Sequence, residues 1–315
     1  MRREAGLNIV MKVGGRRAAW WKSHMAALLP EADVRLADEE MDKDAVDYAV
    51  VWKPAPGWLK TFPNLKCIVS IGAGIDHVLD DTDLPGHLPI IRTTSADLRI
   101  RMREYVVLQV LRLHRRLPDV EAGQPLREWR QIVEPPAHER RVGIMGLGNL
   151  GADCAKALAA LGFDVAGWAR SDKRLDGVTC FAGAEARDTF LARTDILVCM
   201  LPLTAATEGI LNADLFRRLP QDAAVINVAR GRHLVEEDLL DALGSGHIRG
   251  AALDVFRQEP LPETHPFWDH PDILVTPHIA SLIDPVAGGH RIAENLRKFH
   301  AGEPVDDLIP PGKAY

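Results

Sequence analysis

The chain has 315 residues, with 38 Lys and Arg against 44 Asp and Glu, which gives a formal net charge of −6. Hydrophobic residues make up 47% and charged residues 26%, a globular composition that excludes a disordered chain. The length predicts two domains, and the negative charge argues against nucleic acid as the main partner.

Neither a leader nor a membrane span is predicted. The apolar run over 7–13 is interrupted by Asn8 and Lys12, which indicates a first strand rather than the core of a signal peptide. No apolar run approaches the ~20 residues that a transmembrane helix needs. We therefore expect a cytoplasmic protein with no membrane partner.

The cysteines lie far apart and form no C-x-x-C pair, so neither a zinc site nor a thiol redox site is predicted. Cys67 and Cys199 stand in apolar, strand-like runs, where a small buried thiol is the usual role. Cys154 and Cys180 complete the set, and we expect no bound metal.

Residues 1–95 alternate between strand-like and helix-like segments. Such alternation is typical of a parallel sheet with helices on both faces. The strand predicted at 67–71 ends abruptly in Gly72, Ala73 and Gly74. The other predicted elements of this region are strands at 7–13, 47–52 and 88–91 and a helix at 18–29.

A second α/β set follows a helix and a proline-rich segment. Helical spacing of apolar residues predicts one long helix over 101–117, and the prolines of 118–139 indicate a loop or crossover. A closing helix is expected at 283–301, with Gly302 as its stop. Between them we expect strands at 142–145, 164–168, 196–200, 223–228, 250–254 and 273–276 and helices at 152–161, 214–218 and 235–243.

The segment 141–170 predicts a dinucleotide-binding loop. An apolar strand leads into Gly146-x-Gly148-x-x-Gly151, then a helix, then a second strand, and this context makes the glycine pattern specific. Gly146 permits a tight turn, Gly148 lets backbone amides reach a pyrophosphate, and Gly151 lets the helix pack closely on the sheet. The alternative is a plain glycine turn of an α/β fold.

The end of that second strand favours NADP over NAD. An acid usually stands here to bind the ribose hydroxyls, but this strand ends in Trp168, Ala169, Arg170 and Ser171. Arg170 and Ser171, with Lys173 and Arg174 nearby, suit a 2′-phosphate instead. An ordinary solvated basic turn is the simpler interpretation.

Three later segments place polar residues just after predicted strands. Arg230 follows the strand at 223–228, and His278 follows the one at 273–276. Asp254 ends the strand at 250–254, and Glu259 comes shortly after it. The carboxyl ends of parallel strands are where open α/β sheets assemble their sites. We therefore expect these residues to form one site.

These segments, with GLGNLG (146–151) and MLPLTAATEG (200–209), resemble the D-2-hydroxyacid dehydrogenase family over residues 65–282. They are most similar to its glyoxylate/hydroxypyruvate reductase A branch, through the Trp-x-Arg strand end and the runs NVARGRHLVEEDLLDAL and DVFRQEPLP. The resemblance implies an α/β fold class. It implies two Rossmann-like domains, one flavodoxin-like and one dinucleotide-binding, with parallel sheets and a cleft between them.

The resemblance also implies catalytic roles. Arg230 would clamp the substrate carboxylate, His278 would exchange a proton with the substrate oxygen, and Glu259 would orient the imidazole. A surface ion-pair partner, a turn cap and a solvated loop acid are the respective simpler interpretations. Asp254 would touch the nicotinamide side of the cofactor or hold structure by hydrogen bonds.

The implied binding sites span both halves of the chain. Backbone amides of Gly72, Ala73 and Gly74 would bind the substrate carboxylate, with Trp52 and Lys53 either lining the same site or packing. Arg99, Arg101 and Arg103 depart from the family pattern and are expected to face solvent rather than the cleft. The implied cofactor contacts are Gly146, Gly148, Asn149, Leu150, Gly151, Arg170, Ser171, Leu201, Pro202, Thr207, Val228, Ala229 and Asp254.

We therefore predict a substrate-binding domain at 1–98 plus 283–315 and a dinucleotide-binding domain at 99–282, joined by a hinge. The predicted reaction is NADPH-dependent reduction of a small 2-oxo acid, glyoxylate or hydroxypyruvate first, with NADH as the weaker cofactor. A homodimer is expected by resemblance. Phosphoglycerate oxidation and a non-enzymatic, co-repressor-like nucleotide sensor remain the alternatives.

Overall fold

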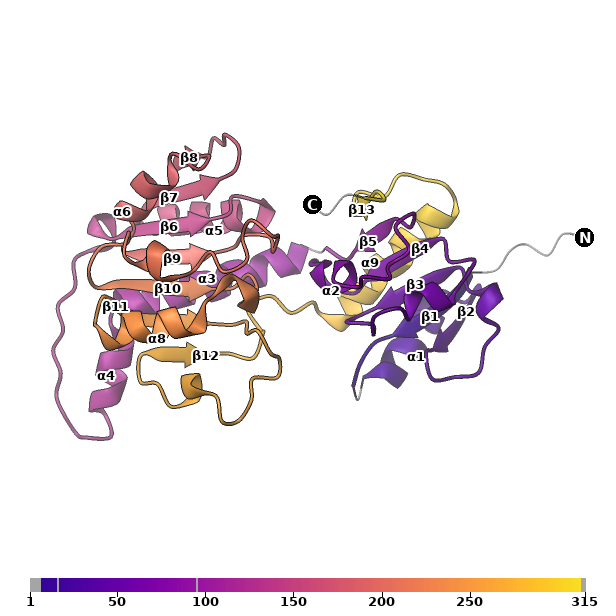
Figure 1. The fold of residues 1–315 in the computed structure, drawn as a ribbon, viewed down its shortest axis with the longest axis horizontal. Helices are drawn as coiled ribbons and strands as arrows, with labels where there is room; N and C mark the ends of the chain where they lie inside the picture. Colours follow the sequence, from indigo (N-terminus) through magenta and orange to yellow (C-terminus); the bar gives the residue numbers. More distant parts are fainter. Residues whose placement is uncertain (1–6, 16, 95, 313–315) are drawn as a thin grey trace, which may run out of the picture. The chain divides into compact units, whose positions relative to one another are not determined.

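The chain divides into two compact units, each built around its own sheet (Figure 1). In the computed structural model, residues 7–15, 17–94 and 96–312 are described. The first unit comprises Met1–Leu98 and Ile283–Tyr315, and the second comprises Arg99–Leu282. The two chain crossings lie within α3 (Ala96–His114) and just before α9 (Pro285–His300).

The sheet of the first unit has the order β13-β5-β4-β3-β1-β2 among the described residues. All neighbours pair in parallel except β13, which runs antiparallel to β5. The two central strands, β3 and β4, are buried throughout and apolar except for Ser70 at the end of β4, as expected for parallel strands covered on both faces. The strands are β1 (Leu7–Lys12), β2 (Ala32–Leu36), β3 (Tyr48–Val51), β4 (Cys67–Ser70), β5 (Ile90–Arg92) and β13 (Leu308–Ile309).

Helices α1 (Ala18–Leu28) and α9 cover one face of this sheet. Met25 of α1 and Ile292 of α9 are fully buried in one apolar cluster with β1, β3 and β4. Asp284 caps α9 by accepting hydrogen bonds from the amides of Val286 and Ala287, which starts the helix at Pro285. The short α2 (Asp76–Leu79) follows β4 and belongs to the cluster on the opposite face.

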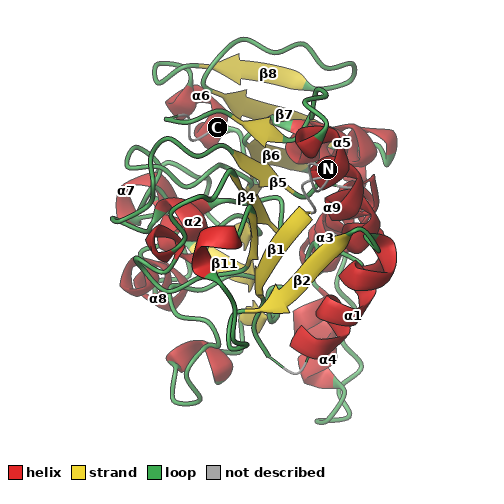
Figure 2. Cartoon of the chain, turned by 90° about the vertical axis from the view of Figure 1, so that its right-hand side faces the viewer, coloured by secondary structure: helices red, strands yellow, loops and turns green. Residues whose placement is uncertain are grey.

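The sheet of the second unit has the order β12-β11-β10-β9-β6-β7-β8, parallel throughout the described residues. Figure 2 shows β6, β7 and β8 side by side, and β6 also pairs with β9. The chain order therefore reverses at β6, which is the switch point where dinucleotides bind in such sheets. The strands are β6 (Arg141–Met145), β7 (Asp164–Ala169), β8 (Thr179–Ala182), β9 (Ile196–Cys199), β10 (Ala223–Asn227), β11 (Ile248–Leu253) and β12 (Ile273–Val275).

Two apolar clusters lie on the two faces of this sheet. One contains Val106 and Val110 of α3 together with Leu158 of α5. The other contains Leu239 of α8 and strand residues facing the opposite way. The remaining helices of the unit are α4 (Leu117–Gly123), α5 (Asn149–Ala160), α6 (Arg187–Ala192), α7 (Ala213–Phe216) and α8 (Glu236–Gly244).

The α/β fold class with predominantly parallel sheets is confirmed, but the prediction for the long helix is wrong in its bounds. Helix α3 begins at Ala96 and ends at His114, because Arg116 adopts a left-handed backbone with φ 50°. A second helix, α4, follows inside the expected loop. Its Pro118 lies in the first turn, where the missing N–H costs no hydrogen bond.

The basic stretch at the start of α3 is partly paired within the second unit. Arg103 Nη1 lies 3.2 Å from Asp153 Oδ2 on α5, and Arg99 lies 3.9 Å from the same carboxylate, while Arg101 is exposed. Within the part of the chain that the structure describes, none of the helices has the length and apolar character that crossing a bilayer requires.

Candidate active site

A glycine loop joins β6 to α5, and two of its glycines are sterically required. Gly146 has φ 107°, and a Cβ there would lie 2.7 Å from the carbonyl oxygen of Met200. A Cβ on Gly151 would lie 1.9 Å from the carbonyl oxygen of Gly146. Gly148 is the N-cap of α5, followed by Asn149 and Leu150 in its first turn. The amides of this helix start therefore suit a pyrophosphate.

The strand after this helix ends in an exposed basic turn. Trp168 points back into the unit and donates from Nε1 to the carbonyl oxygen of Gly183 at 2.8 Å. Arg170 and Ser171 follow β7 directly and are exposed, as are Lys173 and Arg174. The positions predicted to bind a 2′-phosphate therefore stand at the carboxyl end of the strand next to the glycine loop.

The loop after β9 supplies further predicted cofactor contacts. Leu201 is buried, whereas Pro202 is exposed. Thr207 closes the loop, because its hydroxyl donates to the Pro202 carbonyl at 2.7 Å and accepts from the Thr204 amide at 2.9 Å. This turn presents Pro202 at the same edge of the sheet as the glycine loop.

The residues around the end of β10 hold both the side chain and the backbone of Arg230. Val228 and Ala229 are buried, and the Arg230 Nη1 donates to the Ala229 carbonyl oxygen at 2.7 Å. Asn227, at the end of β10, donates from Nδ2 to the Arg230 carbonyl at 3.0 Å. One hydrogen bond therefore holds the Arg230 guanidinium, and the other holds the Arg230 carbonyl oxygen.

His233 is a residue that the sequence pattern did not single out. Its side chain is completely buried. Its Nε2 lies 3.3 Å from the Pro202 carbonyl oxygen, and its Nδ1 lies 3.2 Å from the Arg230 amide nitrogen and 3.1 Å from the Arg230 carbonyl oxygen. The ring thus connects the β9 loop to Arg230, a link between distant segments that no local pattern reveals.

His278 and Glu259 form a direct pair. His278 Nδ1 lies 2.9 Å from Glu259 Oε2 and 3.1 Å from Oε1, so Nδ1 donates to the carboxylate and Nε2 is left for another partner. Glu259 Oε1 also accepts from the Phe256 amide at 3.1 Å. The His278 side chain is 33% exposed and accessible to a ligand. This pair has the arrangement of an oriented general acid–base.

Asp254 anchors the loop that carries His278. Its Oδ1 accepts from the Thr276 hydroxyl at 2.6 Å and the Ile279 amide at 2.9 Å, and its Oδ2 accepts from the Ala280 amide at 2.8 Å. Burial raises the pKa of the Asp254 carboxyl above its usual value, although these hydrogen bonds act in the opposite direction. These contacts support the structural alternative for Asp254.

Tyr105 of α3 extends this network from behind. Its hydroxyl lies 2.7 Å from Thr276 Oγ1. Since the Thr276 proton is given to Asp254, the tyrosine is the donor and the chain runs from Tyr105 through Thr276 to Asp254. Neither Tyr105 nor Thr276 was predicted as a site residue, because their relation depends on packing of α3 against β12.

The first unit brings its own predicted residues together. Val51 and Ser70 are paired neighbours on β3 and β4, so Trp52 and Gly72 follow adjacent strand ends. A Cβ on Gly72 would lie 2.7 Å from Trp52 Cζ3, which shows that the indole packs over this loop. The Gly72 amide donates to Ser70 Oγ at 3.2 Å, so Ala73 and Gly74 carry the amides best suited to a substrate.

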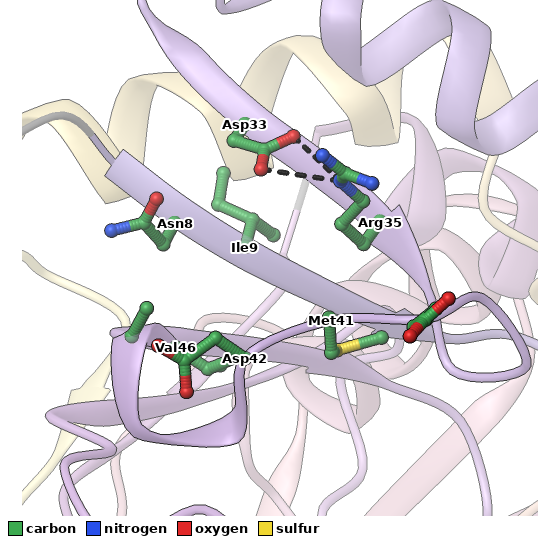
Figure 3. A pocket seen from close by; sticks show the side chains of 9 residues that line it. Asn8, Ile9, Asp33, Arg35, Met41, Asp42 and Val46 are labelled. Carbon is green, nitrogen blue, oxygen red and sulfur yellow. Dashed lines mark hydrogen bonds and ion pairs between the residues drawn. The ribbon is translucent and has the colours of Figure 1, made fainter.

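A hollow of about 480 Å³ in the first unit contains none of the predicted site residues. Arg35 on β2 spans part of it and is paired with Asp33, Nε to Oδ1, at 2.9 Å (Figure 3). Its lining residues are Asn8, Ile9, Asp33, Arg35, Glu40, Met41, Asp42, Ala45 and Val46. Across residues 7–15, 17–94 and 96–312, no three His, Cys, Asp or Glu side chains gather as a metal site.

Comparison with known proteins gives consistent matches. Residues 107–280 match the family described as D-isomer specific 2-hydroxyacid dehydrogenase, NAD binding domain. The glyoxylate/hydroxypyruvate reductase A of Yersinia enterocolitica is 40% identical over 315 residues, covering 98% of this chain and all of that protein.

Solved structures agree with these matches. A D-isomer specific 2-hydroxyacid dehydrogenase from Xanthobacter autotrophicus Py2, in complex with NADPH and MES, is similar with a TM-score of 0.91 and 43% identity, covering 98% of this chain and 100% of that one. An NADPH-dependent glyoxylate/hydroxypyruvate reductase from Sinorhizobium meliloti, in complex with NADP and sulfate, has a TM-score of 0.90 and 38% identity, with the same coverage.

Proposed function

Since the chain belongs to the D-isomer specific 2-hydroxyacid dehydrogenase family, we propose that it reduces glyoxylate or hydroxypyruvate to the 2-hydroxy acid with NADPH. The observation that carries the proposal is the His278–Glu259 pair, which lies on the same sheet edge as Arg230 and the glycine loop. Curated relatives named glyoxylate/hydroxypyruvate reductase A support the choice of substrate. The reaction uses an intracellular supply of reduced cofactor, so we expect the protein in the cytoplasm.

His278 supplies a proton to the substrate, and Arg230 supplies the positive charge that binds its carboxylate. NADPH, when bound, supplies the hydride. His278 holds a proton on Nε2 for the substrate oxygen, and Glu259 stabilises the charged imidazole and fixes its ring through Nδ1. Arg230 presents a planar guanidinium that binds the substrate carboxylate through two hydrogen bonds and polarises the carbonyl.

The cofactor preference rests on the turn after β7. Arg170 and Ser171 are exposed at the strand end where an acid would bind the ribose of NAD. The glycine loop suits the pyrophosphate that both cofactors share, whereas this turn lies where an additional 2′-phosphate would stand. Relatives in complex with NADPH or NADP support binding of the phosphorylated form.

We assign substrate binding to the first unit and dinucleotide binding to the second. The loop after β4 has the amides of Ala73 and Gly74 at a strand end, where backbone donors can hold a carboxylate. Trp52 packs over Gly72 of that loop. The division of the chain at Leu98 and Ile283 agrees with this assignment of roles.

A homodimer is part of the proposal. Trp129 and Val133, in the segment after α4, are 91% and 94% exposed, and Leu126 is 63% exposed. Large apolar side chains exposed to this degree are unfavourable in water and are typical of surfaces that a second copy covers. Sedimentation of the wild type and of Trp129→Glu tests this, since a dimer should dissociate in the variant. A wild-type monomer would contradict the dimer.

Turnover with a panel of acids tests the reaction. We expect loss of reduced-nicotinamide absorbance with glyoxylate or hydroxypyruvate in the wild type and in His270→Ala, and little turnover in His278→Ala. His270 is a matched control because it lies just before β12 and its Nδ1 accepts only a local amide, that of Asp272. Tight NADPH binding without turnover of any 2-oxo acid would favour the nucleotide sensor. Activity confined to phosphoglycerate and NAD would favour that dehydrogenase.

A further inference from the structure

We propose that His77 is a positioning residue that joins the two strand-end loops of the substrate-binding unit and thereby sets the affinity for the 2-oxo acid. The proposal rests on the proposed function. His77 lies on α2, and its ring contacts Lys53, Ser70 and Trp52. Nδ1 is 3.2 Å from the Lys53 amide, Nε2 is 3.0 Å from Ser70 Oγ, and the ring centroid is 4.5 Å from that of Trp52.

The partners determine which nitrogen carries the proton. A backbone amide can only donate, so Nδ1 of His77 must accept from Lys53 and is unprotonated. Nε2 then carries the proton and donates to Ser70 Oγ. A second proton on the ring would place two donors face to face at Lys53. The observed contacts therefore assign the ring proton of His77 to Nε2.

Ser70 passes this constraint to the carboxylate-binding loop. Its side chain is completely buried, and its Oγ accepts from the Gly72 amide at 3.2 Å. Its own proton is directed to the carbonyl oxygen of Gly72 at 3.1 Å or of Gly74 at 3.2 Å. His77 completes the second acceptor site of this hydroxyl, so the orientation of Ser70 and of the loop depends on the ring.

Lys53 and Trp52 are held from the other side. Lys53 adopts φ 47°, a conformation that is unfavourable for a residue with a side chain and needs support from its surroundings. The hydrogen bond from its amide to His77 provides that support. Because Trp52 precedes Lys53 and packs on Gly72, one ring fixes both the indole and the amides beneath it.

Removing the His77 ring should therefore weaken substrate binding and leave the chemical step and cofactor binding nearly unchanged. We expect His77→Ala to raise the KM for the 2-oxo acid at least about tenfold, with kcat within about threefold of the wild type. NADPH affinity, measured by quenching of protein fluorescence, should be unchanged, because the glycine loop lies in the other unit. His77→Asn should recover part of the KM, since a carboxamide oxygen can accept from Lys53. Ser70→Ala should raise the KM in the same way, and adding it to His77→Ala should add little.

Two results would overturn the proposal. One is an unchanged KM in folded His77→Ala and Ser70→Ala. The other is a loss of NADPH affinity parallel to the loss of substrate affinity, which would indicate general damage. Nitrogen NMR of the histidine rings in the wild type gives a test independent of turnover and of mutant folding. A His77 ring protonated on Nδ1 at neutral pH contradicts the assigned contacts. A wild type inactive with every 2-oxo acid would instead refute the proposed function and leave the NMR result to decide the role of His77.

Discussion

Replacing Thr276 with valine should destabilise the second unit much more than removing the hydroxyl of Tyr105. The Thr276 hydroxyl makes two short contacts, 2.6 Å to Asp254 Oδ1 and 2.7 Å to the Tyr105 hydroxyl. Valine preserves the shape and removes both. Tyr105→Phe removes one contact and leaves Thr276 still donating to the carboxylate.

The magnitudes follow from which groups lose their partners. Tyr105→Phe removes one neutral hydrogen bond, which costs about 1 kcal/mol. Thr276→Val removes a hydrogen bond to a charged group, about 1.5–3 kcal/mol, and leaves the Tyr105 hydroxyl without its acceptor, so we expect about 3 kcal/mol in total. For a unit of this size, each kcal/mol lowers the melting temperature by about 2–4 °C. Thr276→Ser keeps the hydroxyl and should cost about 1 kcal/mol or less.

The penalty should also depend on pH, because Asp254 is ionisable. Burial already raises the pKa of this carboxyl in the folded protein, and removal of the Thr276 donor raises it further. An acid whose folded pKa is raised contributes stability that is complete below its unfolded pKa and is lost as the pH rises through the folded value. The cost of Thr276→Val should therefore be largest at neutral pH and shrink as the pH falls toward about 4.

Calorimetry and urea unfolding of the four proteins at pH 5 and pH 7.5 provide the measurement. We expect the wild type to be the most stable protein, Thr276→Ser and Tyr105→Phe to be slightly and similarly less stable, and Thr276→Val to be the least stable. Equal stability of Thr276→Val and Tyr105→Phe would refute the network. A Thr276→Val penalty that grows with acid would refute the assigned direction of the Asp254 pKa.

Three further predictions follow from charge and burial. Arg170→Ala should weaken NADPH binding at least about tenfold and leave NADH binding within about twofold, because only NADPH loses a charge-assisted contact to its 2′-phosphate. Fluorescence titration with each cofactor measures this, and equal weakening of both would contradict the role of Arg170. Burial raises the pKa of the Tyr48 and Tyr105 phenols to about 12. The neutral phenols therefore contribute to the free energy of unfolding below pH 10, and this contribution is lost between about pH 10 and 12. Ultraviolet titration should show one late-ionising phenol fewer in Tyr105→Phe. Burial raises the pKa of Cys67, Cys154 and Cys199 to about 12. A thiol reagent at pH 8 should therefore label only Cys180 in the folded protein, and labelling of a second cysteine would contradict this burial.

The strands that carry the site could be predicted from the sequence, including the edge strand β12, whereas the other edge strands, β2, β8 and β13, could not. Central strands such as β3 and β9 are wholly apolar, so their position is marked by composition. The edge strand β2 contains Asp33 and Arg35, and β8 is only partly buried, so neither shows a continuous apolar run. β13 pairs with β5 across more than two hundred residues, and its two-residue length gives no local signal.

The site residues divide in the same way. Arg230 and His278 were expected because they follow strands, and parallel strands end at a common edge. His233, Thr276 and Tyr105 act through contacts between segments that are distant in sequence. The contact between Tyr105 and Thr276 joins α3 to the end of β12, a separation of 171 residues. Spacing alone carries no information about such a contact.

The first unit is assembled from both ends of the chain, and this has a consequence for biosynthesis. All seven strands of the second sheet lie between residues 141 and 275, so that sheet can form while α9 is still inside the ribosome. One face of the first sheet is covered later, because Met25 and Tyr48 belong to the same apolar cluster as Ile292, Leu296 and Phe299 of α9. Its apolar face therefore stays open through most of translation. This nascent surface is where a chaperone would be needed first.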